Sequence, residues 1–158
     1  MRATLMLAVI AAGLASACAS TATNYQPATA QNPHGYAESM LEENKARITF
    51  SGNSSTELAT VKKYVLFRAA ELTLNSGYDY FVMIDRGVES SAEYRTKGPV
   101  RPRFGGGELE QSGASYEAMA DITMFRGMKP DILPNAYDAH QVQRNLDAGI
   151  VRPTKNQT

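Results

Sequence analysis

The stretch "TELATVKKYVLFRAAELTLNSGYDYFVMID", residues 56–85, decides the fold because it places a long amphipathic helix directly before a strand. In its first part, apolar residues recur every three or four positions, which is typical of a helix that packs on a sheet. This apolar stripe consists of Leu58, Val61, Val65, Ala69 and Leu72. The sequence Asn75-Ser76-Gly77 predicts the end of the helix, since glycine readily takes the left-handed conformation that follows a last turn.

The start of this helix is predicted from the residues that precede it. Ser54-Ser55-Thr56-Glu57 fits the S-x-x-E capping box, in which the serine hydroxyl and the glutamate carboxylate accept hydrogen bonds from backbone N–H groups at the helix start. The helix is therefore expected to begin at about Ser55.

Two strands are expected, one on each side of the helix. Residues 46–51 alternate, with Ile48 and Phe50 on one face, as a half-buried strand does. The strand at residues 78–85 carries apolar side chains on both faces, which is typical of a central strand covered on both sides. Because a single helix joins the two, we expect a right-handed β-α-β crossover with the two strands parallel.

The chain that follows adds two more strands. After a turn at Asp85-Arg86-Gly87, residues 88–97 alternate weakly and are expected to pair antiparallel. The glycine- and proline-rich stretch "KGPVRPRFGGGELEQSG", residues 97–113, predicts an exposed loop or a long hairpin tip. The last strand is expected from about Ala114 to Arg126, and its length suits a position in the sheet beside one or both of the earlier strands.

A short helix is expected near the C-terminus, with Asn135 as its cap and Ala136 to about Ala148 as its length. Together these elements predict an α/β (α+β) fold. It is a two-layer sandwich whose small mixed sheet has three to four strands, in the order β-α-β-β-β-α, with the long helix packed on the sheet. Residues 45–150 form the one expected domain, and residues 151–158 are expected to be a loose tail.

The N-terminus has the features of an export signal. Arg2 is followed by an uncharged, apolar run that ends at Ala17 and is shorter than the ~20 residues needed to span a bilayer. Residues 14–18, Leu-Ala-Ser-Ala-Cys, resemble the bacterial lipobox, in which the cysteine sulfur takes a diacylglycerol before residues 1–17 are removed. Ala15 stands where the lipobox pattern prefers leucine. The resemblance implies that Cys18 is the site of lipidation.

An ordinary secretory signal, cut after Ala15-Ser16-Ala17, is the alternative and leaves Cys18 as a free thiol. Cys18 is the only cysteine of the chain, so it has no partner for an internal disulfide. Lipidation accounts for this single cysteine, whereas a secretory signal alone leaves an exposed reactive thiol unexplained. Ala19, rather than aspartate, follows the cysteine. In the sorting rule of enteric bacteria this residue favours the outer membrane over the inner membrane as the location of the lipoprotein. The protein is thus expected to be anchored in the cell envelope, facing the periplasm.

Residues 18–44 are rich in Ala, Thr, Asn, Gln and Pro and are expected to be a flexible tether. A coil of this length spans ~25 to 30 Å from end to end. The whole chain has 16 basic and 16 acidic side chains, a net charge of zero, which gives no support for nucleic-acid binding or for electrostatic adhesion to anionic lipids.

Three stretches of the chain carry a resemblance to a known family. They are "SGNSST" (51–56), "RAAELTLNSGYDYF" (68–81) and "YDA" (137–139), and they resemble a family of short lipoproteins found mainly in alphaproteobacteria. The resemblance extends from about Tyr25 to Ile150. It implies an exported lipoprotein with one small α/β domain and brings no catalytic residues with it.

No motif of a metal site, a phosphate loop or a nucleophile stands out. His34 and His140 lack the H-x-x-x-H or H-E-x-x-H spacing of metal ligands. The glycines at 105–107 follow Arg101 and Arg103, but no Lys-Ser or Lys-Thr pair follows them, which favours a flexible loop over a phosphate site. The motif G-x-S-x-G is absent from the sequence. No cofactor, metal or catalytic residue is therefore expected.

Asp79 and Asp85 bracket the strand at residues 78–85 and are candidates for ligand or partner contact. A strand-end aspartate acts as a general base when it is buried beside a second acid, but it more often caps a turn or pairs with an arginine such as Arg86. The stretch Arg101-Pro102-Arg103-Phe104 is a second candidate surface, for a protein partner in the envelope.

The sequence predicts a non-enzymatic envelope lipoprotein that binds another envelope component or supports cell-surface organisation. The alternative is a small periplasmic hydrolase or ligand-binding enzyme that uses Asp79 or Asp85 with Arg68, Glu71 or His140. An enzyme needs a concave pocket in which at least two of these groups meet. A sensor of envelope damage is a third alternative, which no residue favours. The oligomeric state is left open.

Overall fold

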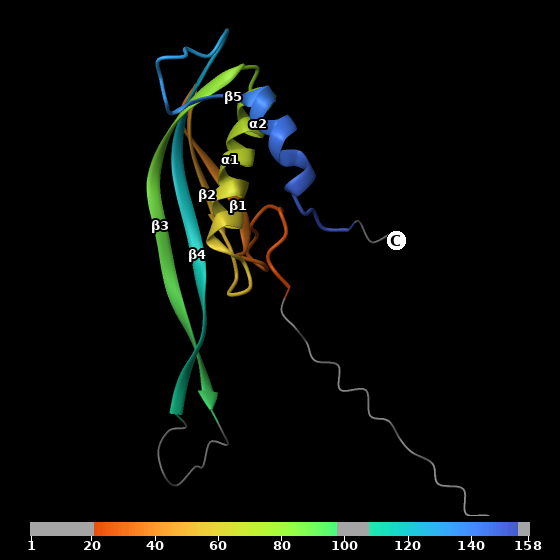
Figure 1. Ribbon diagram of the computed structural model, residues 1–158, viewed down its shortest axis with the longest axis vertical. Helices are drawn as coiled ribbons and strands as arrows, with labels where there is room; N and C mark the ends of the chain where they lie inside the picture. Colours follow the sequence, from red (N-terminus) through yellow and green to blue (C-terminus); the bar gives the residue numbers. More distant parts are fainter. Residues whose placement is uncertain (1–20, 98–107, 155–158) are drawn as a thin grey trace, which may run out of the picture.

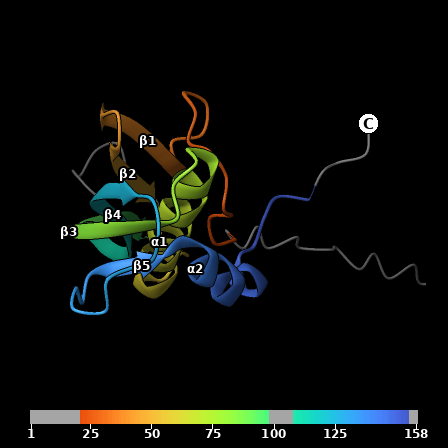
Figure 2. The same cartoon turned by 90° about the horizontal axis from the view of Figure 1, so that it is seen from above.

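The computed structural model describes residues 21–97 and 108–154, which form one sheet with both of its α-helices on the same side (Figures 1 and 2). The elements are, in order, β1 (Gly35–Glu42), β2 (Lys45–Ser51), α1 (Leu58–Asn75), β3 (Tyr80–Lys97), β4 (Glu108–Phe125), β5 (Ala136–Asp138), α2 (Ala139–Leu146) and the 3-10 turn η1 (Asp147–Gly149). The predicted α+β class is confirmed, although the sheet has five strands rather than three or four.

The order of the strands in the sheet is β1-β2-β4-β3-β5, and each neighbouring pair is antiparallel. The expected parallel direction of β2 and β3 is confirmed, but the expected mixed sheet is wrong, because every neighbouring pair of strands is antiparallel. The two strands run in the same direction, but β4 lies between them.

β3 and β4 form one long hairpin that pairs from Tyr80↔Phe125 to Lys97↔Glu108, and β4 also pairs with β2. The turn expected at Asp85-Arg86-Gly87 is therefore wrong, because β3 continues through it with a shift in register, and β4 begins at Glu108 rather than at about Ala114.

The long helix α1 begins later than predicted. Its N-cap is Glu57, for which the described structure shows no side-chain cap hydrogen bond, so the expected capping box does not form. Thr56 instead donates to the Asn53 side chain over 2.7 Å and accepts the backbone N–H of Thr23 at 2.8 Å. The predicted end is confirmed, because Gly77 follows the helix with a φ of +77°.

The core lies between α1 and one face of the sheet. Alternate residues of β2 and β4 point toward the helix and are buried, and Phe81 of β3 joins them with no exposed surface. These inward residues of the two strands are Ala46, Ile48, Phe50, Ala118, Ala120, Ile122 and Met124. The prediction that both faces of β3 are covered is wrong, because the described elements cover one face only and Ile84, on the other, is 55% exposed.

The N-terminal residues differ most from the prediction, since most of the expected tether is folded. Residues 35–42 form the edge strand β1, and Tyr25 is 6% exposed. The Tyr25 ring packs against those of Tyr36, Tyr64 and Phe67, with centroids 4.8, 5.4 and 5.2 Å away. The composition of this stretch is polar, but its two tyrosines bury enough surface to fix it. The domain therefore includes Thr21 onward and does not begin at residue 45.

The C-terminal helix is shorter than predicted and has a different cap. Asp138 caps α2 by accepting the backbone N–H of Gln141 at 2.8 Å, whereas Asn135 donates its side-chain amide to the Met83 carbonyl. Residues 136–138 thereby extend the sheet as β5. The tail is held at its start, because the backbone N–H of Tyr25 donates to the Val151 carbonyl at 2.7 Å.

Candidate functional site

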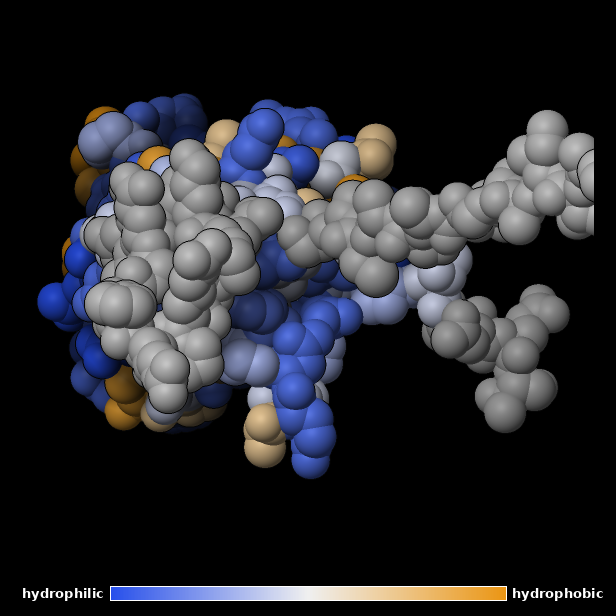
Figure 3. Space-filling model, turned by 90° about the horizontal axis from the view of Figure 1, so that it is seen from below, coloured by the Kyte–Doolittle hydropathy of each residue, from blue (hydrophilic) through white to orange (hydrophobic). Residues whose placement is uncertain are grey.

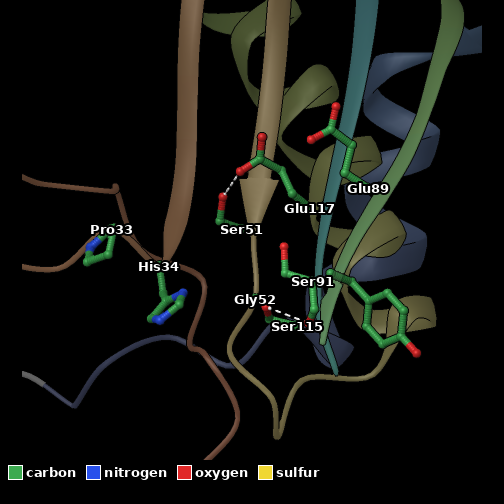
Figure 4. Close-up of a pocket in the computed structure, with 9 residues that line it drawn as sticks. Pro33, His34, Ser51, Gly52, Glu89, Ser91, Ser115 and Glu117 are labelled. Carbon is green, nitrogen blue, oxygen red and sulfur yellow. Dashed lines mark hydrogen bonds between the residues drawn. The ribbon is translucent and has the colours of Figure 1, made fainter. Parts of the chain in front are cut away.

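A polar hollow of about 250 Å³, called here the polar cleft, lies on the open face of the sheet (Figure 4). It is formed where β2 ends beside the middle of the β3–β4 hairpin and the loop before β1. Its lining is rich in hydroxyl and carboxylate groups, and the residues are Pro33, His34, Ser51, Gly52, Glu89, Ser91, Ser115, Tyr116 and Glu117.

Two carboxylates face each other across the polar cleft. Glu89 of β3 is directly opposite Glu117 of β4, an arrangement of like charges that destabilises an antiparallel pair. The Ser51 hydroxyl donates to the Glu117 carboxylate, and within the described residues neither glutamate has an arginine or lysine within ion-pair distance. The cleft therefore concentrates hydrogen-bond acceptors and negative charge, which suit ammonium or hydroxyl groups.

His34 reaches the cleft from the β1 side, as Figure 4 shows. Its Nδ1 atom is buried and makes no hydrogen bond within the described structure. The residues described contain no group of three or more His, Cys, Asp and Glu side chains arranged for a metal ion. Neither the histidine spacing nor the composition predicted this site, because strand pairing brings Glu89 and Glu117 together.

A second hollow, called here the apolar cavity, lies between α1 and the inner face of β3 and β4 and has a volume of about 410 Å³. Most of its lining is apolar, but Lys62 and Lys63 of α1 and Asp85 of β3 also contribute. The other lining residues are Ala59, Val65, Leu66, Met83, Ala118, Met119, Ala120 and Leu146.

An ion-pair cluster occupies the open face of the sheet between β2, β4 and β3. Asp121 accepts from Arg47 Nε at 2.8 Å and from Arg86 Nε at 2.8 Å, and it is 9% exposed. The hydrogen bond from Arg47, and then that from Arg86, outweigh the effect of burial and hold the pKa of Asp121 below its ordinary value. The sequence suggests Arg86 as a partner for a strand-end aspartate, but Arg86 binds Asp121 instead.

The structure does not bring Asp79 and Asp85 together in one site: Asp79 lies in the bend just before β3, and Asp85 lies inside β3, where the register shifts before Gly87. Asp79 accepts the backbone N–H of Gly127 at 2.6 Å, and Asp85 accepts that of Gly87 at 2.8 Å. Each carboxylate thus satisfies a backbone N–H group, that of Asp79 from a residue distant in the chain and that of Asp85 from a near neighbour. Of the two, only Asp85 lines either hollow described above.

Arg68 and Glu71 belong to a network that holds the N-terminal segment on α1. Arg68 binds Glu38 of β1 and Glu71, and the Tyr25 hydroxyl donates to Glu71. Burial, reinforced by the Glu71 carboxylate, raises the pKa of Tyr25. Burial lowers the pKa of Arg68, but the hydrogen bonds to Glu38 and Glu71 outweigh it and leave that pKa above its ordinary value.

The remaining predicted residues lie elsewhere. His140 is exposed on α2, away from the lining of both hollows. An enzyme was expected to have a pocket in which at least two of the candidate polar groups meet. Neither hollow is such a pocket, because Asp85 is the one candidate group that lines either of them. Cys18 and the stretch Arg101, Arg103 and Phe104 lie outside the described residues.

Comparison of the chain with protein-family models, with curated proteins and with solved structures gave no match in any of the three cases. Across residues 21–97 and 108–154, no helix combines the length and the apolar character needed to cross a membrane. The fold and the two hollows define a small α+β domain with one open sheet face.

Proposed function

We propose that the chain is an envelope lipoprotein, attached to a membrane by lipid on Cys18, and that its α+β domain is a non-enzymatic binding module. The export-signal features, the single cysteine and the resemblance to short lipoproteins support the attachment. One structural observation carries the proposal further. Only Ala19 and Ser20 separate Cys18 from Thr21, which already belongs to the folded domain.

The segment from Thr21 onward is fixed to the connection between β2 and α1. The Thr21 carbonyl accepts the Asn53 side-chain amide at 2.7 Å, and Asn53 donates its backbone N–H to the Thr23 hydroxyl at 2.9 Å. Thr23 is 7% exposed. Three residues of extended chain span at most ~11 Å, so lipid on Cys18 holds this end of the domain close to the membrane surface.

Figure 3 shows the domain from below, the side toward which its first described residues lie in Figure 1. Its coloured surface is mainly hydrophilic, with scattered apolar residues. A surface of this kind has little affinity for lipid tails, whereas two or more acyl chains make attachment nearly permanent. In the proposal, the lipid therefore supplies the attachment and the protein surface stays in water.

The polar cleft lies beside the proposed anchor, because Ser51 and Gly52 directly precede Asn53, which binds Thr21. In the proposed function it contacts an envelope component that offers ammonium or hydroxyl groups. The facing carboxylates of Glu89 and Glu117 would gain a counter-charge or hydrogen-bond donors on binding.

The attachment is tested on protein from its native membrane. Mass spectrometry of the N-terminal peptide is expected to show an acylated Cys18, and a Cys18→Ser protein is expected to appear in the osmotic-shock extract. Ser20→Ala, which leaves the cysteine in place, is the matched control and should stay with the membrane. A native protein with a free Cys18 thiol, or a Cys18→Ser protein that remains bound, would contradict the proposal.

The binding role is tested by cross-linking in intact cells, with identification of the attached molecules. Glu89→Gln combined with Glu117→Gln is expected to lower the yield of the major adduct. Asp131→Asn also removes a carboxylate, from a fully exposed position outside the cleft, and should leave the yield unchanged. Equal yields from all three proteins would remove the polar cleft from the proposal.

A further inference from the structure

We propose that the apolar cavity is a binding site for a single-chain anionic amphiphile, a long-chain fatty acid. The acyl chain lies between α1 and the sheet, against Leu66, Met83 and Leu146, and the carboxylate is held by Lys62 and Lys63. This site is separate from the polar cleft and does not depend on lipid at Cys18.

The cavity exists because the sheet carries small side chains under the first half of α1. On the inner face of β4, the first two inward residues, Ala118 and Ala120, are small, whereas the next two, Ile122 and Met124, are larger. Beside them, the register of β3 shifts between Asp85 and Gly87. The resulting volume of about 410 Å³ falls in the range of about 300–1,000 Å³ that is usual for small-molecule sites.

The lining suits an acyl chain because its larger side chains are only partly covered. Leu66, Met83 and Leu146 pack on the core but keep part of their surface exposed, and they come from three different elements. A flexible hydrocarbon inserted between them would remove that apolar surface from water, which is the main driving force for such binding.

The charges of the lining favour an anion. Lys62 and Lys63 are consecutive on α1, and within the described residues neither has a carboxylate within 4 Å. Lys63 Nζ lies 5.6 Å from the centre of the Tyr64 ring. Asp85 is the one acidic residue of the lining, and its carboxylate already accepts the Gly87 N–H. Two ammonium groups that have no carboxylate partner among the described residues, next to an apolar hollow, match a carboxylate on a hydrocarbon chain.

Two single substitutions reduce the cavity from opposite sides. Ala120→Leu fills it from the sheet, and Ala59→Leu narrows it from the first turn of α1, where the residue is exposed and leucine is a good helix former. Ala37→Leu, on the exposed outer side of β1, adds the same side chain away from the cavity and is the matched control.

The test is titration calorimetry with sodium laurate below its micelle concentration. It uses the full mature chain carrying Cys18→Ser, so that no attached lipid contributes. Saturable one-to-one binding is expected. Ala120→Leu and Ala59→Leu should each weaken binding by tenfold or more, and Ala37→Leu should not. Thermal unfolding shows which variants are folded. If Ala120→Leu does not fold, the affinity of Ala59→Leu for laurate provides the test.

The head group is tested separately. Lys62→Gln combined with Lys63→Gln should weaken laurate binding roughly tenfold, as expected for the loss of charge-assisted contacts, while binding of the uncharged dodecanol stays within about twofold. Dodecyltrimethylammonium, with the same chain and a positive head, should bind more weakly than laurate. Unsaturable laurate binding, equal affinity in Ala59→Leu, or tighter binding of the cationic amphiphile would each overturn the proposal. All of these measurements are independent of whether Cys18 is acylated in the cell.

Discussion

Arg68 of α1 binds Glu38 of β1 through two parallel hydrogen bonds, from Nε to Oε2 at 2.7 Å and from Nη2 to Oε1 at 2.9 Å. The same guanidinium donates to Glu71 at 2.9 Å and lies 4.3 Å from the centre of the Tyr36 ring. The Arg68 side chain is only 15% exposed. One arginine thus joins the edge strand to the helix, and it contacts Glu38, Glu71 and Tyr36 at the same time.

Arg68→Met is expected to lower the free energy of unfolding by about 2 kcal/mol, between the values typical of exposed and of buried ion pairs. The loss arises because Glu38 and Glu71 keep their charge without their cation. Urea unfolding at neutral pH measures it. Lys45→Met breaks the exposed pair with Glu42, which has an N–O distance of 2.8 Å, and should cost less than about 1 kcal/mol. Equal losses in the two variants would contradict this interpretation.

Tyr25 tests whether the N-terminal segment belongs to the folded domain. Tyr25→Ala removes a ring packed against three others and is expected to lower the free energy of unfolding by about 3 kcal/mol. Tyr25→Phe keeps the ring but loses the hydrogen bond to Glu71, at a cost of about 1 kcal/mol. Denaturant unfolding of both variants gives the comparison. A flexible tether over residues 18–44 would leave stability unchanged in each.

Gly35 and Gly77 both have positive φ values, +142° and +77°, but their surroundings differ. A Cβ atom at Gly35 would overlap the backbone carbonyl oxygen of Gln26, whereas one at Gly77 meets nothing within 4 Å in the described structure. Gly77→Ala should therefore cost about 1 kcal/mol for backbone strain alone. Gly35→Ala should cost more than twice as much, because the bridge between Pro27 and Tyr36 must move. Thermal unfolding that ranks the two variants in the reverse order would contradict the packing.

Asp121 predicts an acid-dependent part of the stability. Because Arg47 and Arg86 hold its pKa in the folded state below the unfolded value of about 3.9, the stabilisation is complete above about pH 5 and is lost as the pH falls through the folded pKa. Asp121→Asn lacks this contribution. The difference in unfolding free energy between wild type and Asp121→Asn should shrink as the pH is lowered from 5 toward 2. Asp131→Asn, at an exposed site, serves as the control and should show no such trend.

The features that the sequence predicted well are those that depend on neighbours along the chain. The stripe through Val61 and Val65 marks the buried side of α1, and the alternation around Ile48 marks the inner face of β2, because periodicity is a local property. Gly77 ends the helix for a local reason as well.

The features that were missed depend on pairing between distant segments. The length of the last strand allowed a position beside one or both of the earlier strands, but only the pairing along the whole hairpin fixes β4 between β2 and β3. The facing glutamates and the alanines of the apolar cavity follow from the same register. The polar composition around Tyr25 concealed a folded segment, because its burial is decided by the rings of Tyr64 and Phe67, about forty residues away.

The fixed position of Thr21 beside Asn53 determines what a lipidated form of this protein can meet. A protein on a long flexible linker samples a hemisphere of solution, but one whose lipidated cysteine is separated from the fold by only two residues stays within a thin layer over its own leaflet and diffuses in two dimensions. Encounters with other residents of that leaflet then occur at a high effective concentration, so weak individual contacts suffice. A longer linker between Cys18 and Thr21 would lower the effective concentration of these partners without changing any contact that the domain makes.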